Sequence, residues 1–388
     1  MFSQMTKKKV LIIQNKPTQF DTGLFEQIKL KDSFSVTMHY TRWDVANIEL
    51  YDPEINRNSG WSLINNEIET LGVGINSNYF VNIYKMLFVR DFDLVIISGY
   101  SSLRHLYLLL ICKLLGFKVG LRADTVLKYD KGFFKLFVKK TILSFIYKFF
   151  NFGFPVSTLS CDSMKKLGMT SESLFYFPYG IDEIFIETKK IHSNSFRLDW
   201  RKKLSINESD FVTISVIKFV PREDPFTVLK AFEVLVESSS NIHLILVGDG
   251  YLMNEIKEFI SARNLVTRIT LTGYLSYNEL IELYFASDIF LHPANIEQWG
   301  VSVHEAILCD LPVIVSDGVG SAVDLINSGI SGLVYRSGDY LDLIEKVVTY
   351  RNFTEQWRLN AIHTANVLAS FWTHKTTVLE IERCLKLN

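Results

Sequence analysis

Two glutamates with seven residues between them, Glu297 and Glu305, form the spacing in this sequence that is best suited to chemistry. The first follows a short apolar run, and the second lies about one turn into a stretch with helical spacing that begins near Gly300. At such a helix start the backbone N–H groups of Gly300, Val301 and Ser302 have no partner within the helix. Together with the positive end of the helix dipole they suit a diphosphate, which Gly300 would allow close to the backbone.

A purely structural role for these residues is an open alternative. Ser302-x-x-Glu305 has the form of a capping box, in which Glu305 would bind a free N–H group at the helix start. The surroundings favour a ligand site, because one strand-like run precedes the pair and another, Pro312–Ser316, follows it. Parallel sheets bind ligands at the carboxyl ends of such strands.

Short apolar runs alternate with longer helical patterns along nearly the whole chain. This alternation predicts an α/β protein with two doubly wound parallel sheets, each covered by helices on both faces. We expect the first sheet from strands at Val10–Gln14, Ser35–Tyr40, Asp93–Ser98, Lys118–Arg122, Ser157–Ser160 and Leu174–Phe177. We expect the second sheet from strands at Phe211–Ile217, Ile242–Val247, Ile269–Thr272, Ile289–His292, Pro312–Ser316 and Gly332–Tyr335.

The expected domain boundary lies in the polar stretch that follows Pro178–Asp182. We predict one Rossmann-like domain over residues 1–185 and another over residues 186–370. The amphipathic segment 371–388 is expected to be a final helix that packs back across the boundary. Two such domains in series would face each other across a cleft, and the chemistry is expected where their strand ends meet.

The composition is that of a packed globular protein. Hydrophobic residues make up 48% of the 388 residues, and this length suits two domains. The four cysteines form no Cys-x-x-Cys pair, which argues against a zinc site or a disulfide framework and favours a reducing cytoplasm. The sequence has neither a signal-peptide core nor an uncharged stretch of transmembrane length, so we expect a soluble or peripheral protein.

Charge is unevenly distributed along the chain. Of the 41 basic and 42 acidic side chains, residues 1–190 contain 24 and 18, whereas residues 191–388 contain 17 and 24. Within the basic half, residues 128–154 combine a stripe of lysines with many phenylalanines. Such a segment is either a buried helix with one solvated face or a helix that lies on an anionic membrane. The excess of positive charge favours peripheral contact with the membrane, and no nucleic acid is expected as a partner.

The stretch from Asp288 through Glu297 and Glu305 to Ser316 resembles the Glu-x7-Glu block of glycosyltransferase family 4. The members of this family are retaining enzymes with the two-Rossmann-domain fold called GT-B. The resemblance extends in order over nearly all of residues 205–350, and the first half matches only loosely, mainly through Pro178–Asp182. The other matching stretches are Phe211–Lys230, His243–Gly250, Ile269–Leu275 and Ser331–Asp339.

The resemblance implies roles for individual residues. Glu305 would hold the ribose hydroxyls of a nucleotide, and Glu297 would contact the transferred sugar on the face where the new bond forms. Lys218 and a second basic side chain would neutralise the diphosphate as it leaves. A fixed cation beside a leaving group is most effective there, because charge develops on that group in the transition state.

Two departures from the family pattern affect this donor site. The chain has Ile217-Lys218 where the family usually has Gly-Arg, which keeps the charge but loses a bidentate fork. It also has Glu223 where a lysine is usual, and we expect the neighbouring Arg222 to supply the missing charge. A smaller departure is Asp310, where a glycine is common.

Candidate acceptor residues follow two strands of the first half. Arg122 and Asp124 end the expected strand Lys118–Arg122, and the resemblance suggests that a polar residue here contacts the sugar or the acceptor hydroxyl, with Asp124 as a catalytic candidate. A salt bridge or a helix cap is the structural alternative. Gln19 and Phe20 follow the first strand and are the other acceptor candidates.

Asp91-Phe-Asp93 has the spacing with which another class of glycosyltransferases holds a divalent metal. Here the triplet precedes a strand and so lies at the amino end of the sheet, away from the expected site. We therefore predict a solvated strand start and no catalytic metal.

The resemblance implies a metal-independent glycosyltransferase that moves a hexosyl or N-acetylhexosaminyl group from a UDP- or GDP-sugar to a glycan or lipid-linked acceptor. Such an enzyme would serve the synthesis of a cell-surface polysaccharide or glycolipid in the cytoplasm, with the nucleotide-sugar as substrate and no cofactor. Two alternatives stay open. One is a catalytically weak sensor of sugar nucleotides, which Glu223 makes conceivable. The other is a nucleotide-sugar epimerase or a phosphorylase on the same scaffold.

Overall fold

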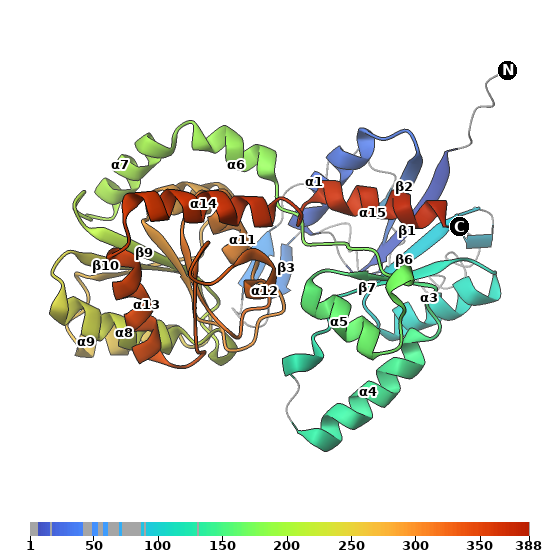
Figure 1. Ribbon diagram of the computed structural model, residues 1–388, viewed down its shortest axis with the longest axis horizontal. Helices are drawn as coiled ribbons and strands as arrows, with labels where there is room; N and C mark the ends of the chain where they lie inside the picture. The colour runs from blue at the N-terminus through green and yellow to red at the C-terminus, as the bar shows by residue number, and fades with distance from the viewer. Residues whose placement is uncertain are drawn as a thin grey trace. The chain divides into compact units, whose positions relative to one another are not determined.

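A computed structural model describes residues 7–15, 18–41, 49–52, 57–60, 70–71, 87–88, 91–129 and 132–387. The chain divides into two compact units, each of which is described by itself (Figure 1). Unit 1 comprises residues 1–50, 59–181 and 372–388, and unit 2 comprises residues 51–58 and 182–371. The last helix of the chain therefore belongs to unit 1.

The sheet of unit 1 has six parallel strands in the order β5-β2-β1-β6-β7-β8. This order, with strands added outward on both sides of the first, is that of a doubly wound nucleotide-binding fold. The predicted α/β class is thus confirmed for this unit. The strands are β1 (Lys8–Gln14), β2 (Phe34–Tyr40), β5 (Thr70–Leu71), β6 (Leu94–Ser98), β7 (Val119–Ala123) and β8 (Phe152–Pro155).

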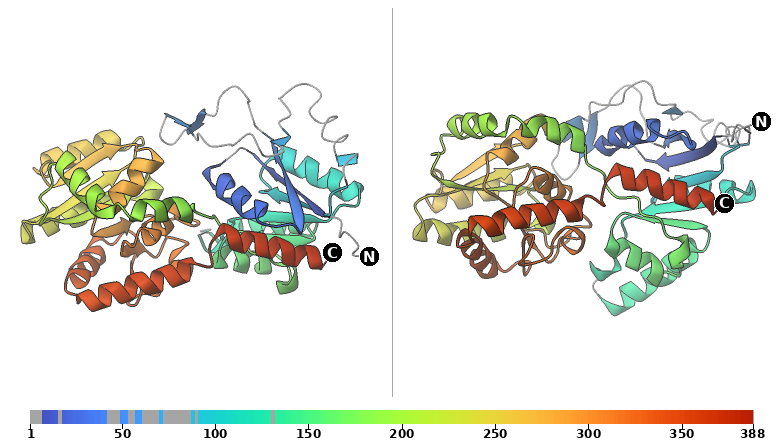
Figure 2. Two further views of the ribbon diagram at one scale, coloured as in Figure 1. Left: turned by 90° about the horizontal axis from the view of Figure 1, so that it is seen from above. Right: turned by 45° about the horizontal axis from the view of Figure 1, so that its top comes forward.

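Alternate residues of β1 supply the two cores of unit 1. Val10 and Ile12 pack against α1 and the C-terminal helix α15, whereas Leu11 and Ile13 face α3 and α5 on the other side of the sheet (Figure 2). A strand buried on both faces needs such a continuous apolar run. The helices are α1 (Gln19–Lys29), α3 (Leu103–Leu114), α4 (Phe133–Tyr147), α5 (Thr158–Lys166) and α15 (His374–Lys386).

The strand expected at Ser157–Ser160 is wrong, because these serines begin α5. The Ser157 hydroxyl accepts a hydrogen bond from the Ser160 amide, and the Ser160 hydroxyl accepts one from the Ser157 amide. Serine favours such caps over strand interiors. The neighbouring strand is instead β8, and Leu174–Phe177 follows its edge through two backbone hydrogen bonds without forming a strand of its own.

The sheet of unit 2 has the order β11-β10-β9-β12-β13-β14, again with parallel neighbours. All six strands expected in the second half are present. They are β9 (Phe211–Val216), β10 (Ile242–Val247), β11 (Ile269–Gly273), β12 (Ile289–His292), β13 (Val313–Ser316) and β14 (Leu333–Tyr335). The helices around them are α6 (Glu183–Lys190), α7 (Ser193–Lys203), α8 (Pro225–Ser238), α9 (Met253–Ala262), α10 (Tyr277–Phe285), α11 (Val301–Leu308), α12 (Ala322–Leu325), α13 (Tyr340–Arg351) and α14 (Glu355–Ala369).

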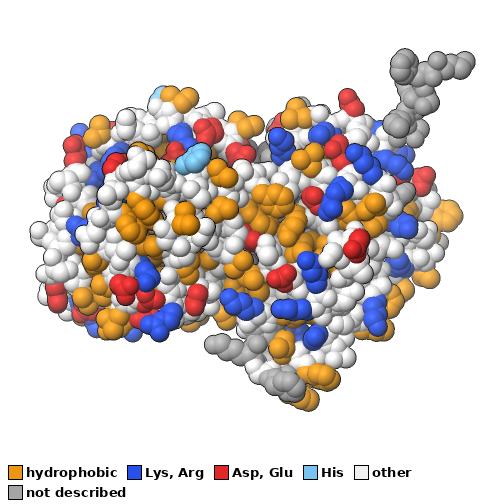
Figure 3. All heavy atoms as spheres, viewed as in Figure 1, with side chains coloured by type: hydrophobic (Ala, Val, Ile, Leu, Met, Phe, Trp, Pro, Cys, Tyr) orange, Lys and Arg blue, Asp and Glu red, His pale blue; other side chains and the backbone are white. Residues whose placement is uncertain are grey.

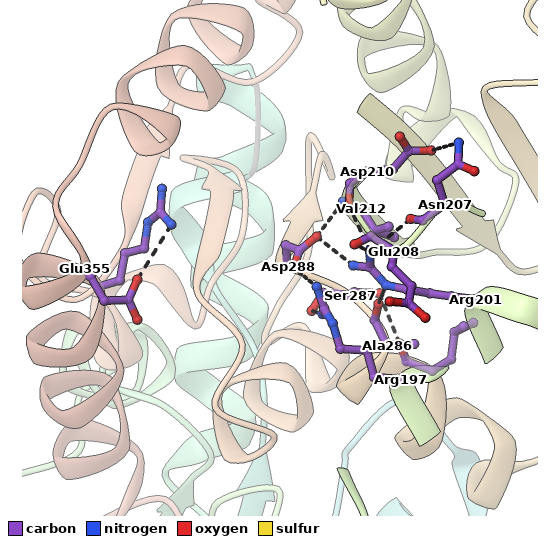
Figure 4. Close-up of polar contacts among 12 residues, drawn as sticks. Arg197, Arg201, Asn207, Glu208, Asp210, Val212, Ala286, Ser287, Asp288 and Glu355 are labelled. Carbon is purple, nitrogen blue, oxygen red and sulfur yellow. Dashed lines mark hydrogen bonds and ion pairs between the residues drawn. The ribbon is translucent and has the colours of Figure 1, made fainter. Parts of the chain in front are cut away.

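A buried arginine fixes the amino ends of β9 and β12 to α7. Arg201 is only 2% exposed, and its guanidinium donates to the carbonyl groups of Ala286, Glu208 and Asp210 and pairs with Asp288 (Figure 4). Asp288 also accepts from the Val212 amide and pairs with Arg197. A buried charge is tolerated when its donors are satisfied in this way. The network holds the sheet at the end opposite the candidate site.

The described helices include none that is both long enough and apolar enough to cross a membrane.

Candidate active site

The loop between β12 and α11 carries the centre of the candidate site. Gly300 is the N-cap residue of α11 and has a φ of 86°, a left-handed conformation that favours glycine. Among the residues that the structure describes, no side chain caps this helix start. The N–H groups of Val301 and Ser302 therefore stay available for an anionic ligand at the positive end of the helix.

The capping-box explanation of Ser302-x-x-Glu305 is wrong. Ser302 is the second residue of α11, and its hydroxyl donates to the Val216 carbonyl at the end of β9, at 3.3 Å. The Glu305 carboxylate faces the phenol of Tyr284, which donates to it at 3.3 Å. Glu305 is thus turned into the protein and does not bind the helix start.

Glu305 is a buried carboxyl group with a single hydrogen-bond donor among the described residues. It is 5% exposed, and burial raises its pKa from 4.5 to about 8, although the hydrogen bond from Tyr284 acts in the opposite direction. Burial raises the pKa values of Tyr277 and Cys309, and the nearby charge of Glu305 raises them further. A carboxyl group with unused lone pairs can bind the hydroxyl groups of a ligand.

Glu297 is held through its backbone by the loop after β13. Its amide donates to the Gly318 carbonyl at 3.0 Å, and its carbonyl accepts from the Gly320 amide at 2.8 Å. A Cβ atom on Gly320 would collide with the carbonyl oxygen of Gln298, so the close approach of the two loops needs a glycine there. The carboxylate of Glu297 accepts a hydrogen bond from Arg222 at 3.0 Å.

Arg222 lies between two carboxylates. One end of its guanidinium contacts Glu297, and the other contacts Glu223 at 2.9 Å. Arg222 thus contacts both Glu297 and the neighbouring Glu223. Burial and the nearby charge of Glu297 raise the pKa of Glu223 from 4.5 to about 7, against the opposing effect of Arg222.

Lys218 follows β9 in the same loop and is half-buried. Its backbone amide donates to the second oxygen of Glu223 at 2.7 Å, and the next amide, that of Phe219, donates to the Asp249 carbonyl at 2.9 Å. These bonds fix the loop at the carboxyl ends of β9 and β10. Lys218, Arg222, Glu297 and the start of α11 thus lie at the same edge of the sheet.

Arg122 and Asp124, the acceptor candidates of unit 1, do not pair with each other among the described residues. The Arg122 guanidinium lies 4.3 Å from the ring centre of Phe177 and 5.1 Å from that of Tyr179. Asp124 accepts a hydrogen bond from the Tyr179 hydroxyl at 3.0 Å. Both side chains are half-buried beside the segment after residue 177, at the carboxyl end of β7.

Gln19 and Phe20 are the first residues of α1, but their side chains lie outside what the structure describes. Their neighbour Asp21 is buried and accepts hydrogen bonds from Gln14, Thr18 and Tyr40. Asp21 therefore stabilises the turn from β1 into α1.

The Asp91-Phe-Asp93 triplet lies at a strand start, as predicted. Asp93 pairs with the side chain of Lys8 at 2.7 Å and accepts from the Lys9 amide at 2.8 Å. Within the described ranges, no group of three or more His, Cys, Asp or Glu side chains is arranged to hold a metal ion.

A polar hollow of about 280 Å³ lies at the amino ends of β9, β10 and β12. Arg197, Asp288 and Arg351 line it. Ligands of doubly wound sheets bind at the opposite end of the strands, so this hollow is separate from the candidate site.

Three features of the site were missed by the sequence reasoning. The glycines of Gly318-Val-Gly320 predict a turn after a strand. The sequence does not show that this turn packs against the loop that contains Glu297. Tyr284 sits in an amphipathic helix without any motif, and its contact with Glu305 depends on tertiary packing. The position of Glu223 between Lys218 and Arg222 likewise follows from the fold of the loop.

Comparison with known proteins shows that most of unit 2 is similar to a known family. Residues 196–364 match the family described as glycosyl transferases group 1. A GDP-mannose-dependent alpha-mannosyltransferase of Corynebacterium glutamicum is 25% identical over 218 residues, which are 56% of this chain and 46% of that protein. An alpha-monoglucosyldiacylglycerol synthase of Streptococcus pneumoniae is 25% identical over 158 residues, 41% of this chain and 35% of that protein. The chain thus spans less than half of these relatives.

Solved structures match the fold over both units. HepE of Anabaena, in complex with UDP and glucose, has a TM-score of 0.70 at 17% identity and covers 98% of this chain, with all of its own chain matched. The predicted GT-B fold is therefore confirmed. The match to the glycosyl transferases group 1 family covers residues 196–364, and the candidate site lies within these residues.

Proposed function

We propose that this protein is a retaining glycosyltransferase that moves a hexosyl or N-acetylhexosaminyl group from a nucleotide diphosphate-sugar to a glycan or lipid-linked acceptor. The observation that carries the proposal is the convergence of Lys218, Arg222, Glu297 and the start of α11 at one edge of the unit 2 sheet, with Glu305 buried behind it. HepE, which shares the fold, binds UDP and glucose.

The proposed mechanism depends on the negative charge that the leaving diphosphate gains during the reaction. The bond between the sugar and the diphosphate breaks, and negative charge develops on the diphosphate. Lys218, Arg222 and the amides of Val301 and Ser302 would stabilise this charge, since preorganised donors and cations act most strongly in the transition state. Glu305 would bind the ribose, and Glu297 the transferred sugar. No step requires a metal ion, so we propose metal-independent catalysis.

On the acceptor side we propose Arg122, Asp124, Gln19 and Phe20 as contacts, with Asp124 next to the reacting hydroxyl. Asp124 directly follows β7 and accepts a hydrogen bond from the hydroxyl of Tyr179 through one oxygen, and within the described ranges its other oxygen has no hydrogen bond. A carboxylate in this position can accept the proton of the attacking hydroxyl.

We further propose that the protein contacts the cytoplasmic face of an anionic membrane through residues 128–154. Helix α4 contains Lys139 and Lys140 and no acidic residue, and Phe134, Phe137 and Phe145 are 78%, 60% and 63% exposed. Hydrophobic side chains gather at the lower edge of the molecule in Figure 3, where Figure 1 shows α4. The diacylglycerol-linked product in the name of one relative agrees with a lipid-linked acceptor.

Release of nucleoside diphosphate tests the proposal. The wild-type protein is incubated with UDP- and GDP-sugars, with and without lipid or glycan acceptors, and the product is examined by NMR for the configuration of its anomeric carbon. A product with the donor's configuration is expected. An inverted product would refute retention, whereas an altered sugar on an intact nucleotide would support an epimerase, which the comparisons do not favour.

A further inference from the structure

Glu223 introduces a buried negative charge at the point where a donor diphosphate would bind. It is 6% exposed, and its two oxygens have different partners: one accepts from the Lys218 amide at 2.7 Å, and the other pairs with Arg222 at 2.9 Å. Arg222 also pairs with Glu297 at 3.0 Å. One guanidinium is thus shared between two carboxylates.

The local charges leave little attraction for a dianion. The charged groups that act on Glu223 are Arg222, Lys218 and Glu297. With both glutamates ionised, the positive and negative side chains cancel. A nucleotide-sugar brings two further negative charges, and the start of α11 offers only about half a positive charge. Beyond these residues, His292 ends β12 near Arg222, and burial lowers its pKa to about 3, so it adds no charge at neutral pH.

We propose that Glu223 is a positioning residue that holds Arg222 while the donor is absent, and that it takes up one proton when a donor diphosphate draws Arg222 away from it. This inference rests on the proposed function. Protonated Glu223 keeps its bond to the Lys218 amide through one oxygen, and its new O–H group can donate to the diphosphate. The carboxylate thereby changes from a repelling group into a donor, and Arg222 gains freedom to bind phosphate.

The proton uptake has a definite sign. In the free protein the pKa of Glu223 is raised to about 7, and two added negative charges would raise it further in the complex. Donor affinity is therefore constant below this value and falls with rising pH above it, by up to about tenfold per pH unit for one proton. Glu305 acts in the opposite direction, because a carboxylate that accepts from ribose hydroxyls is favoured in the complex and releases its proton.

The test measures donor affinity against pH. UDP-glucose and GDP-mannose are the probes, since the HepE complex and the name of one relative point to them, and their diphosphates stay fully ionised in this range. Dissociation constants are measured by calorimetry between pH 6 and 8.5 for the wild type, for Glu223→Gln and for the control Glu208→Gln, which changes an exposed glutamate. Repeating the titrations in two buffers with different ionisation enthalpies counts the protons bound.

We expect the wild type and Glu208→Gln to take up about three quarters of a proton more than Glu223→Gln at pH 7.5, and Glu223→Gln to bind about tenfold more tightly at pH 8. Equal proton counts in the wild type and Glu223→Gln, with tight binding in both, would overturn the inference and leave the proposed function intact. Failure of both probes to bind any of the three proteins would instead overturn the proposed function, and the inference with it.

Discussion

At the scale of single residues, the two glutamates of one motif have very different surroundings. Glu305 is enclosed in the protein beside Tyr284, whereas Glu297 is partly exposed and pairs with Arg222. Glu305 is suited to bind the nucleotide, which the reaction leaves unchanged. Glu297 is suited to contact the sugar, which is transferred. Their separate environments imply separate effects on kinetics.

We expect Glu305→Gln to weaken nucleotide-sugar binding by about ten- to a hundredfold, because hydrogen bonds to a charged group contribute about 1.5–3 kcal/mol. Glu297→Gln is expected to lower kcat with little change in the dissociation constant of the donor. Calorimetry with the donor and a steady-state assay of nucleotide release measure the two quantities. If both variants change the same quantity by the same small amount, the division of roles is wrong.

The cations beside these glutamates provide a second test. Lys218→Ala and Arg222→Ala should each reduce kcat by a factor on the order of 100, since fixed positive charge stabilises the leaving diphosphate. Matched controls are Lys257→Ala and Arg336→Ala, which change exposed side chains of the same unit. Wild-type rates in Arg222→Ala would leave Lys218 as the cation of the site and would favour a sugar-nucleotide sensor.

Burial of Glu305 also predicts a dependence of stability on pH. Its pKa is raised from 4.5 to about 8 on folding, so between these values the unfolded chain is ionised while the folded protein keeps the proton. This contribution to stability is present below pH 4.5 and is lost as pH rises towards 8. The Tm of Glu305→Gln relative to the wild type should therefore increase from pH 5 to pH 8. A difference that stays constant across this range would contradict the assigned burial.

At the scale of elements, α4 leaves three phenylalanine side chains exposed. Phe134 and Phe145 lie on a helix whose only charged residues are lysines. Transfer of a phenylalanine side chain from water to an apolar medium contributes about 1.5–3 kcal/mol, so several together can anchor a helix in a membrane interface.

Replacement of Phe134, Phe137 and Phe145 by serine should reduce binding to vesicles that contain phosphatidylglycerol by at least about tenfold, as measured by co-sedimentation. The fold should persist, because these side chains are exposed. Leu359→Ser, an exposed position on α14 of unit 2, serves as the control. Equal binding of all three proteins, or equal binding to vesicles of phosphatidylcholine alone, would refute an electrostatic and apolar contact through α4.

At the scale of the whole molecule, the sheets were predictable because strands buried on both faces leave long apolar runs. Val212, Leu244 and Ile314 are inside such runs, and all six strands of the parallel sheet of unit 2 were predicted. The strand predicted at Ser157–Ser160 was wrong because the actual strand, β8, lies just before it. β8 is short and contains Gly153 and Pro155, which are uncommon in strands, so its sequence does not resemble a strand. Local sequence patterns predict which segments are buried and where the chain turns, but they do not predict which loops contact each other in the folded protein.

The candidate site was likewise predictable only where its residues are close in sequence. Gly300 and the two glutamates were recognised from their spacing, since the strand, loop and helix that hold them are continuous in sequence. The ion pair between Arg222 and Glu297 joins that segment to a loop 75 residues earlier, the loop that also contains Glu223. Such a contact depends on the order of the strands in the sheet, which no local pattern specifies.

We propose that this chain transfers a sugar from a nucleotide diphosphate-sugar without a metal, and the release of nucleoside diphosphate is the most direct measurement of that reaction. The wild type, Lys218→Ala and Lys257→Ala are incubated in excess EDTA with UDP- and GDP-sugars in the presence of candidate glycan and lipid acceptors. We predict release in the wild type and in Lys257→Ala that depends on both donor and acceptor, and release about a hundredfold slower in Lys218→Ala. Release that stops in EDTA and returns with Mg²⁺ or Mn²⁺, or release that is equal in all three proteins, would contradict the account.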